Sequence, residues 1–336
     1  MKNEMYKNLK KLDKELAKEG ISRRDALKLF GLGSSSLLLS SSTELNATTK
    51  MHASSKKVKI LIIGGGLAGI STAARLNNML ENPDITVVEP NNKSVSYQPG
   101  NTFICAGLYE KKDVIYNTND YIPKGVKLIY DKAIEFTPDK NKVITAKGQV
   151  LKYDYMVVAA GLVFDFAKIK GLEEAGDMYT LGDSKKLLEV LDNAGASTIY
   201  NTDAAVATWK NMQKVINDAA NGKKINAVFT HPNTAIKCGG APKKIMYLMN
   251  ARLNEAGKEA RTNTTMTFYP NGKKLFGVKE YNDAIEKQFK DRNFKYNFAH
   301  NLIEVDAQNR TAIFDHHWQV KGEYDEDLEE YDMITK

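Results

Sequence analysis

The sequence predicts an α/β chain with two Rossmann-like domains, each a parallel sheet layered between helices. Three observations carry this prediction. A continuous apolar strand over 58–63 runs directly into a glycine-rich turn. Helix-like and strand-like segments then alternate along the chain, which is typical of parallel sheets. A second strand-led unit of the same kind begins near residue 225.

Composition allows this fold and excludes several other classes. The chain has 336 residues, 42% hydrophobic and 26% charged, enough for two domains with sizeable cores. Its two cysteines exclude a disulfide scaffold. The net charge of +7 is uneven, because residues 1–53 hold ten Lys and Arg against six Asp and Glu. The remainder is only +3, so we expect no nucleic-acid partner.

Residues 1–53 are predicted to form an export signal. A Lys-rich stretch ends in Ser22-Arg23-Arg24-Asp25, a weakly apolar segment follows over 29–39, and small residues precede a cut expected near Ala47 or Ala53. The pattern Ser-Arg-Arg-x-x-x-Lys resembles the twin-arginine signal, which implies export of a folded cofactor protein to the periplasm. A disordered basic extension is the alternative.

The remaining chain divides into three predicted parts: a first domain over 54–165, a second over 166–322, and a return toward the first over 323–336. In the first domain we expect a helix over 70–80 and strands over 58–63, 85–88, 126–130, 142–145 and 155–160. Residues 173–223 are helix-leaning, with a loop over 194–198. The second domain should hold strands over 225–230 and 266–269, helices over 242–256 and 282–292, and a strand pair over 302–320.

The glycine-rich turn indicates a nucleotide site, because Gly64-x-Gly66-x-x-Gly69 follows a strand and opens a helix. Gly64 permits the tight turn, Gly66 lets the backbone approach a pyrophosphate, and Gly69 lets helix and strand pack closely. Unpaired N–H groups and the helix dipole favour the pyrophosphate. Glu89 ends the next strand and can accept hydrogen bonds from a ribose, which disfavours NADP.

FAD is favoured over NAD by a second segment. The strand from Tyr153 to Gly161 resembles the second fingerprint of flavoproteins with two dinucleotide domains. The second domain shows no corresponding G-x-G-x-x-G, since its first strand runs into Pro232-Asn-Thr-Ala-Ile-Lys-Cys238. A second dinucleotide is therefore not expected.

Four segments resemble the sulfide:quinone oxidoreductases, in particular the branch with the mitochondrial enzyme. They are Ser96-Tyr97-Gln98-Pro99, the run from Pro232 to Leu248, Phe276-Gly-Val-Lys279, and Asn301-Leu-Ile-Glu-Val305. The resemblance runs from about Val58 to Lys336. It implies a glutathione-reductase-like fold, FAD, oxidation of hydrogen sulfide and reduction of a quinone, either ubiquinone or menaquinone.

The resemblance also implies roles for individual residues. The FAD-binding positions are Gly64, Gly65, Gly66, Gly69, Glu89, Gln98, Ala133 and Gly161, with Ala133 placed where a backbone group faces the adenine. Cys238 matches the cysteine that takes up the sulfur of sulfide. No metal site is expected, because the adjacent His316 and His317 would point to opposite faces of a strand.

Two departures from the family pattern bear on function. The chain stops soon after Tyr331, so we expect the fold to be incomplete at the C-terminus. The absent part should hold the partner cysteine, the quinone pocket and the amphipathic helices that place the family at the inner membrane surface. In addition, Tyr97 rather than Cys105 lies near the position that binds flavin covalently in flavocytochrome c sulfide dehydrogenases. A homo-oligomer is left open.

The two cysteines have different settings. Cys238 precedes two glycines and a helix, and the helix N-terminus and Lys237 both favour the reactive thiolate. In a disulfide with a partner, one sulfur would be attacked by hydrosulfide, leaving a persulfide. Cys105 lies in an apolar stretch, where packing is favoured over a relay role. His231 precedes the motif and is either structural or tunes the cysteine.

Of three alternatives to a periplasmic sulfide:quinone oxidoreductase, two stay open and one is disfavoured. The chain resembles the flavoprotein subunit of a flavocytochrome c sulfide dehydrogenase next best. A type II NADH dehydrogenase is disfavoured by the turn after residue 230. A non-catalytic FAD-binding remnant is the alternative from a different class, because only one half of the redox pair is identified.

Overall fold

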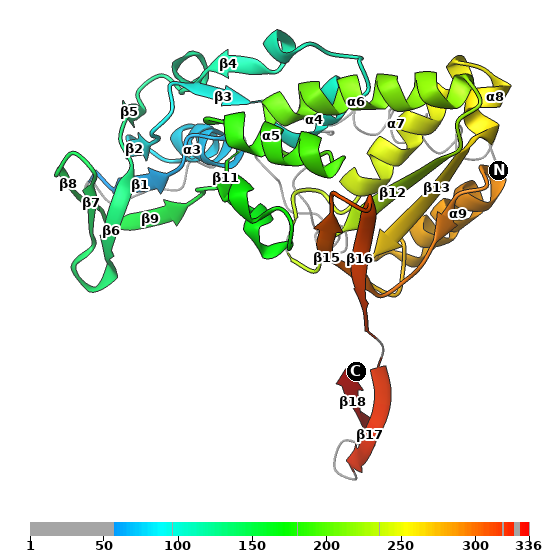
Figure 1. The fold of residues 1–336 in the computed structure, drawn as a ribbon. Coiled ribbons are helices and arrows are strands. Elements are labelled where there is room, and N and C mark those ends of the chain that lie inside the picture. Colours follow the sequence, from blue (N-terminus) through cyan, green and yellow to red (C-terminus); the bar gives the residue numbers. More distant parts are fainter. Residues whose placement is uncertain are drawn as a thin grey trace, which may run out of the picture. The chain divides into compact units, whose positions relative to one another are not determined.

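The parallel sheet of the N-terminal part is built from strands that are far apart in the sequence. The computed structural model describes residues 57–336 except 96, 180, 235, 318, 326–329 and 336. Strand β1 (Lys59–Ile63) lies between β2 (Asp84–Val88) and β9 (Tyr155–Val158), and β5 (Lys127–Ile129) pairs with β2 (Figure 1). All these pairs are parallel, so the carboxyl ends of β1, β2 and β9 share one edge.

Helix α3 (Leu67–Met79) connects β1 to β2 and begins three residues before the expected 70–80. The reason is the glycine turn, because Gly66 occupies the N-cap and the helix starts directly after it. Gly69 and Ala73 are the buried residues of this helix. The predicted order of strand, glycine turn, helix and strand is confirmed, as is the fold class.

Between β2 and β9 the chain adds helix α4 (Tyr97–Cys105), which was not predicted. It also adds two small antiparallel sheets, whose strands are β3 (Lys93–Val95) with β4 (Ile115–Asn117), and β6 (Ala133–Thr137), β7 (Lys142–Thr145) and β8 (Val150–Lys152). Of these strands only β7 was predicted, with the same bounds. Single 3₁₀ turns cover Lys111–Asp113, Thr118–Tyr121 and Pro138–Lys140.

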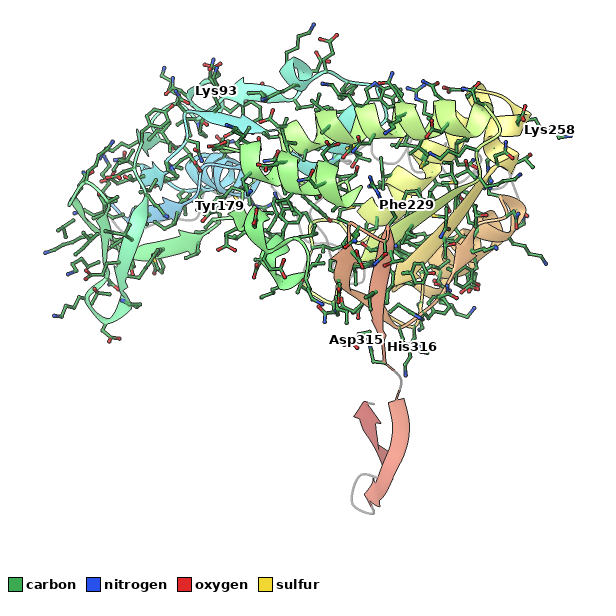
Figure 2. All side chains as sticks on the ribbon, viewed as in Figure 1. Lys93, Tyr179, Phe229, Lys258, Asp315 and His316 are labelled. Carbon is green, nitrogen blue, oxygen red and sulfur yellow. The ribbon has the colours of Figure 1, made fainter. Side chains whose placement is uncertain are left out.

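The second parallel sheet begins at residue 225, as predicted. Its strands are β12 (Ile225–His231), β13 (Thr264–Pro270) and β14 (Lys295–Tyr296), in that order. Helices α7 (Ala241–Glu255), α8 (Lys258–Thr262) and α9 (Lys279–Asp291) alternate with them. The core holds the fully buried Met246, Met266, Phe268 and Phe289, and Phe229 of β12 packs against it (Figure 2).

The helix-leaning region between the two sheets forms two helices. They are α5 (Lys185–Ala194) and α6 (Thr202–Ala220), and the predicted loop over 194–198 separates them. Leu187, Leu191 and Ala204 help bury one face of this pair. A short antiparallel pair, β10 (Phe164–Asp165) with β11 (Asp177–Met178), precedes them, with 3₁₀ turns at Phe166–Lys168 and Glu173–Ala175.

The C-terminal region consists of two antiparallel hairpins. Strands β15 (His300–Asp306) and β16 (Thr311–His316) form the expected strand pair, which covers 300–316 instead of 302–320. Asp315 and His316 lie at the end of β16 (Figure 2). Strands β17 (Gln319–Asp325) and β18 (Glu330–Thr335) form the second hairpin. Among the described residues, no helix is long and apolar enough to cross a membrane. The predicted export signal over 1–53 lies outside the described residues.

Candidate functional site

The glycine turn after β1 has no room for side chains at two positions. A Cβ atom on Gly64 would lie 2.2 Å from the carbonyl oxygen of Ala159, and one on Gly69 would lie 1.8 Å from the carbonyl oxygen of Gly64. Gly64 also has a φ of +107°, which L side chains rarely adopt, and its N–H donates to Val88 at 2.8 Å. These contacts fix the turn at the carboxyl edge of the sheet.

Gly66 differs from its neighbours because space is open around it. A Cβ atom there would meet nothing within 4 Å. The residue stands at the N-cap of α3, and the first turn of this helix has no acidic side chain. Free N–H groups and the positive end of the helix dipole therefore face open space, the arrangement that binds phosphate groups.

Glu89 is held beside this turn. Its Oε2 atom accepts a hydrogen bond from the N–H of Gly65 at 2.8 Å. Its Oε1 atom accepts from the backbone N–H of Asn91 at 2.8 Å and from the Asn91 amide at 3.0 Å. A carboxylate has about four acceptor sites, so Glu89 is oriented by the protein and keeps capacity for ribose hydroxyl groups.

The other predicted nucleotide-binding residues are distributed around the same sheet. Gly161 follows β9, has a φ of +78° and leaves open space around its Cα atom. Ala133 is half-buried at the start of β6, opposite Thr145. Gln98 lies in α4, and its side chain is outside the described part of the structure. The turn, Glu89 and Gly161 gather at the carboxyl ends of neighbouring strands, where α/β sheets bind nucleotides.

These residues fit a bound FAD. The open cradle at Gly66 suits a pyrophosphate, and the oriented Glu89 carboxylate suits the adenosine ribose. Gly64, Gly65 and Gly69 build the turn itself. A Cβ atom would collide with Ala159 from Gly64, with Glu89 from Gly65, and with the carbonyl oxygen of Gly64 from Gly69.

Cys238 lies in the connection between β12 and α7, three residues before the helix starts. Its side chain is exposed and its backbone has a φ of +63°, a left-handed conformation that non-glycine residues adopt rarely. Its carbonyl oxygen accepts a hydrogen bond from the N–H of Ala241 at 2.9 Å. The strained turn presents the sulfur atom at the beginning of a long helix.

The surroundings of Cys238 favour the thiolate. Partial burial, the largest influence, raises the pKa of Cys238, but hydrogen bonds from the backbone N–H groups of Gly240 and Ala241 and the charge of Lys244 outweigh it. The Lys244 ammonium group donates to the sulfur atom at 3.3 Å. The net effect is a pKa below the ordinary value of a thiol, as required of a reactive cysteine.

The cation beside the sulfur is therefore Lys244, whereas the sequence pointed to Lys237. The Lys237 ammonium group lies 5.3 Å from the ring centroid of Phe164, and burial lowers its pKa. Its carbonyl oxygen accepts a weak hydrogen bond, 3.4 Å long, from the hydroxyl group of Tyr200. Burial and the charge of Cys238 raise the pKa of Tyr200 to about 12, so this donor stays protonated.

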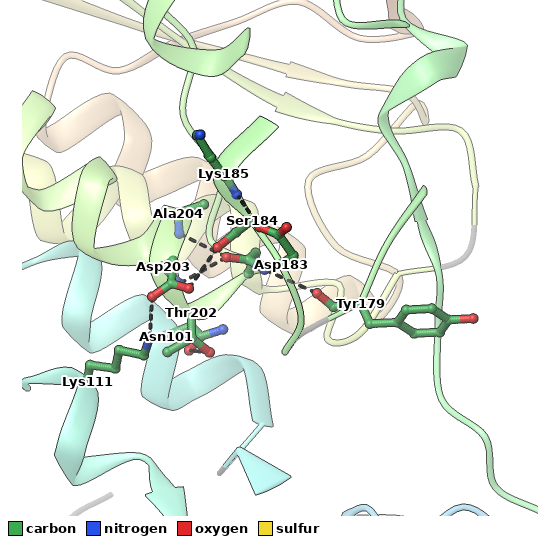
Figure 3. A network of polar contacts seen from close by, with 10 residues as sticks. Asn101, Lys111, Tyr179, Asp183, Ser184, Lys185, Thr202, Asp203 and Ala204 are labelled. Carbon is green, nitrogen blue, oxygen red and sulfur yellow. Dashed lines mark hydrogen bonds and ion pairs between the residues drawn. The ribbon is translucent and has the colours of Figure 1, made fainter. Parts of the chain in front are cut away.

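A polar network surrounds the start of α6, directly after Tyr200 in the sequence (Figure 3). Asn201 caps this helix, accepting from the N–H groups of Asp203 and Ala204 at 2.9 and 3.0 Å. Asp203 accepts from Ser184 at 2.7 Å and pairs with Lys111. Thr202 donates to Asn101 of α4 at 3.3 Å, so the network ties α6 to α4.

Cys105 is a packed cysteine, as the sequence favoured. It is fully buried, and burial raises the pKa of its thiol to about 12, partly offset by a hydrogen bond with Thr208. It shares an apolar cluster with Ile104, Ala205 and Ala241. Both cysteines are free thiols, and a protonated buried thiol is a poor nucleophile.

No metal centre accompanies these groups in the described part of the chain, which contains no cluster of three or more His, Cys, Asp or Glu residues suited to a metal ion. His231 ends β12 and is half-buried. Burial and the charge of Lys243 both lower its pKa, which favours the neutral imidazole.

Comparison with known proteins agrees with this geometry. A family profile described as pyridine nucleotide-disulphide oxidoreductase matches residues 58–286. The chain is 33% identical over 277 residues to the mitochondrial sulfide:quinone oxidoreductase of Dictyostelium discoideum, which covers 82% of this chain and 56% of that protein. It is 34% identical to the mitochondrial sulfide:quinone oxidoreductase of Mus musculus, covering 76% and 52%.

The fold is similar to a solved structure as well. The X-ray structure of the sulfide:quinone oxidoreductase from Aquifex aeolicus superposes with a TM-score of 0.59 and 20% identity, over 83% of this chain and 57% of that one. The chain thus spans about half the length of the curated relatives it matches. The profile match covers the first parallel sheet, the Cys238 turn, and β12 and β13 of the second sheet, and the chain therefore belongs to the pyridine nucleotide-disulphide oxidoreductase family.

Proposed function

We propose that this chain is the FAD-binding and sulfur-accepting part of a sulfide:quinone oxidoreductase. The observation that carries the proposal is the Cys238 turn: an exposed sulfur atom, a left-handed backbone and the Lys244 ammonium group 3.3 Å away. The similar relatives named sulfide:quinone oxidoreductase support the choice of sulfide as donor and quinone as acceptor.

The residues of this chain would act before any electron reaches a quinone. In the oxidised protein Cys238 would share a disulfide with a second thiol. Hydrosulfide attacks the Cys238 sulfur, the disulfide bond breaks, the second thiol leaves as a thiolate, and a persulfide forms on Cys238. Two electrons are released when that thiolate and the terminal sulfur of the persulfide join in a new S–S bond. When bound, FAD would supply the two-electron acceptor for this step, with a quinone as the final acceptor. Lys244 would stabilise the anionic sulfur throughout.

The partner thiol is not Cys105 in this proposal. Cys105 is fully buried and keeps its proton to a pH of about 12, so it can neither leave as a stable thiolate nor meet hydrosulfide.

We also propose a periplasmic, membrane-peripheral location. Its support is the Ser22-Arg23-Arg24 pattern and the quinone named for the relatives.

The sulfur-accepting step can be tested on this chain alone. Treatment with dithionitrobenzoate should give a mixed disulfide on Cys238, and hydrosulfide should then release thionitrobenzoate. Attack at the Cys238 sulfur leaves a persulfide, which mass spectrometry detects as one added sulfur atom on the peptide that contains Cys238. Cys105→Ser should behave like the unchanged chain, and Cys238→Ser should give no release.

Recovery of the unmodified Cys238 thiol would contradict the proposal, because hydrosulfide would then have attacked the other sulfur atom. Persulfide on Cys105 would contradict it as well.

A further inference from the structure

Lys243 is a buried lysine next to the exposed cysteine turn. It is the third residue of α7, and only 3% of its surface is exposed. Its ammonium group donates to the carbonyl oxygen of Gly239 at 2.9 Å. Among the described residues, no carboxylate lies within 4.0 Å of it as an ion-pair partner. A buried charge without a carboxylate is costly, so its presence calls for another interaction that favours it.

Two of its neighbours are aromatic rings. The ammonium group lies 5.2 Å from the ring centroid of Phe268 in β13 and 5.9 Å from that of Phe276. Cation–π attraction offsets part of the desolvation cost. Burial nevertheless lowers the pKa of Lys243 to about 8, while the charge of Cys238 raises it. The group is therefore still mainly a cation at neutral pH.

The coupling between Lys243 and Cys238 acts in both directions. The thiolate raises the pKa of the lysine, and the same attraction favours the thiolate form of Cys238. Two other titratable groups belong to this cluster. Lys244 contacts the sulfur from the exposed side, and His231 of β12 is kept neutral in part by the charge of Lys243.

We propose that Lys243 is a positioning residue for Cys238, a buried cation that holds the turn through Gly239 and stabilises the thiolate from inside the protein. This inference rests on the proposed function for its biological meaning, but its physical content concerns the thiol alone. Lys243 and Lys244 then have separate tasks. Lys244 makes the direct contact with sulfur, whereas Lys243 fixes the carbonyl group next to the cysteine and contributes charge that water does not screen.

The test measures the pKa of Cys238 from the pH dependence of its alkylation by iodoacetamide. Lys243→Met keeps the length and apolar stem of the side chain but removes the charge. We expect the pKa of Cys238 to rise by about one unit, so that alkylation at pH 7 slows roughly tenfold. Lys243→Arg keeps the charge and should restore most of the rate. Lys279→Met, at an exposed ion pair in α9, is the matched control and should change nothing.

Salt separates the two lysines. The contribution of exposed Lys244 should fall as ionic strength rises, and that of buried Lys243 should persist. The backbone N–H groups of Gly240 and Ala241 also lower the pKa of Cys238 and remain in Lys244→Met. Adding Lys243→Gln to Lys244→Met should therefore raise the pKa of Cys238 further at high salt. An unchanged Cys238 pKa in that double variant would overturn the proposal even if Lys243→Met did not fold.

A purely structural role for Lys243 makes a different prediction. It requires that Lys243→Met lose thermal stability while the pKa of Cys238 stays unchanged, and that result would refute our inference. The outcome is also distinct from failure of the proposed function. If hydrosulfide left no persulfide on Cys238 while the pKa still shifted in Lys243→Met, the function would be wrong and the role of Lys243 would stand.

Discussion

The burial of Lys243 should make the free energy of unfolding depend on pH, and Lys243→Met should remove that dependence. The pKa of this lysine falls from 10.5 to about 8 in the folded protein, where only 3% of the residue is exposed to solvent. A difference of about 2.5 at 1.36 kcal/mol per pH unit corresponds to roughly 3 kcal/mol of destabilisation. Lys243→Met removes this cost.

The direction of this pH dependence follows from proton binding by the folded and unfolded chains. Below pH 8 both folded and unfolded chains hold the proton, and the full cost of the buried charge is present. Between pH 8 and 10.5 the folded chain releases its proton first, so the cost disappears as pH rises. At pH 7 we expect Lys243→Met to be more stable than the unchanged chain by about 2 kcal/mol, once about 1 kcal/mol is subtracted for the lost bond to Gly239.

Urea unfolding followed by circular dichroism at pH 7 and pH 10 measures both effects. The difference in unfolding free energy between the two proteins should shrink by most of its value at pH 10. Lys279→Met should follow the unchanged chain at both pH values. An equal pH dependence for Lys243→Met and the unchanged chain would refute the assignment of a buried, depressed lysine, as would a loss of stability at pH 7.

Four further variants test other parts of the protein. Gly69→Ala should lower the free energy of unfolding by more than about 3 kcal/mol, because its Cβ atom would lie 1.8 Å from a carbonyl oxygen. Gly66→Ala should keep the fold and weaken FAD binding, because space is open there. Equal thermal midpoints for the two variants would contradict this. Glu89→Arg should lose FAD on purification, because a cation replaces the acceptor oriented by Gly65 and Asn91, and stoichiometric FAD in that variant would count against the site. Arg23-Arg24→Lys-Lys should block export, and an intact N-terminus on wild-type protein from a cytoplasmic fraction would argue against a signal in residues 1–53.

The nucleotide turn could be predicted from the sequence because its determinants are local. Gly64, Gly66 and Gly69 sit at fixed offsets after an apolar strand, and Glu89 directly follows the next strand of the parallel pair. Backbone geometry alone then dictates where they meet. The same applies to α7, which starts after two glycines and has a proline as its second residue, all encoded next to Cys238.

The electrostatic partners of Cys238 could not be predicted in the same way. Lys237 is adjacent in sequence, but its side chain turns toward Phe164, whereas Lys244, six residues away, reaches the sulfur through the first turn of α7. Lys243 was missed because its burial depends on Phe268 in a different strand. Tertiary contacts of this kind leave no local pattern. Helix α4 was missed for a related reason, since it packs against α6 through Asn101 and Thr202.

The packing of Cys105 could be predicted from the sequence only in part. Its apolar neighbours in sequence favoured burial, but the contacts that fix it come from Thr208 of α6 and the cluster around Ala241 of α7. The sequence therefore indicated that this thiol is inert, and the structure supplies the reason, because the pKa of about 12 follows from desolvation by those helices.

The central claim is that sulfide sulfur enters the protein at Cys238 and that its electrons reach FAD. The most direct measurement is flavin bleaching by sulfide under anaerobic conditions, in the full-length protein purified with its flavin. We expect rapid bleaching in the unchanged protein and in Cys105→Ser, and none in Cys238→Ser with the same flavin content. Bleaching of Cys238→Ser at the unchanged rate would contradict the claim.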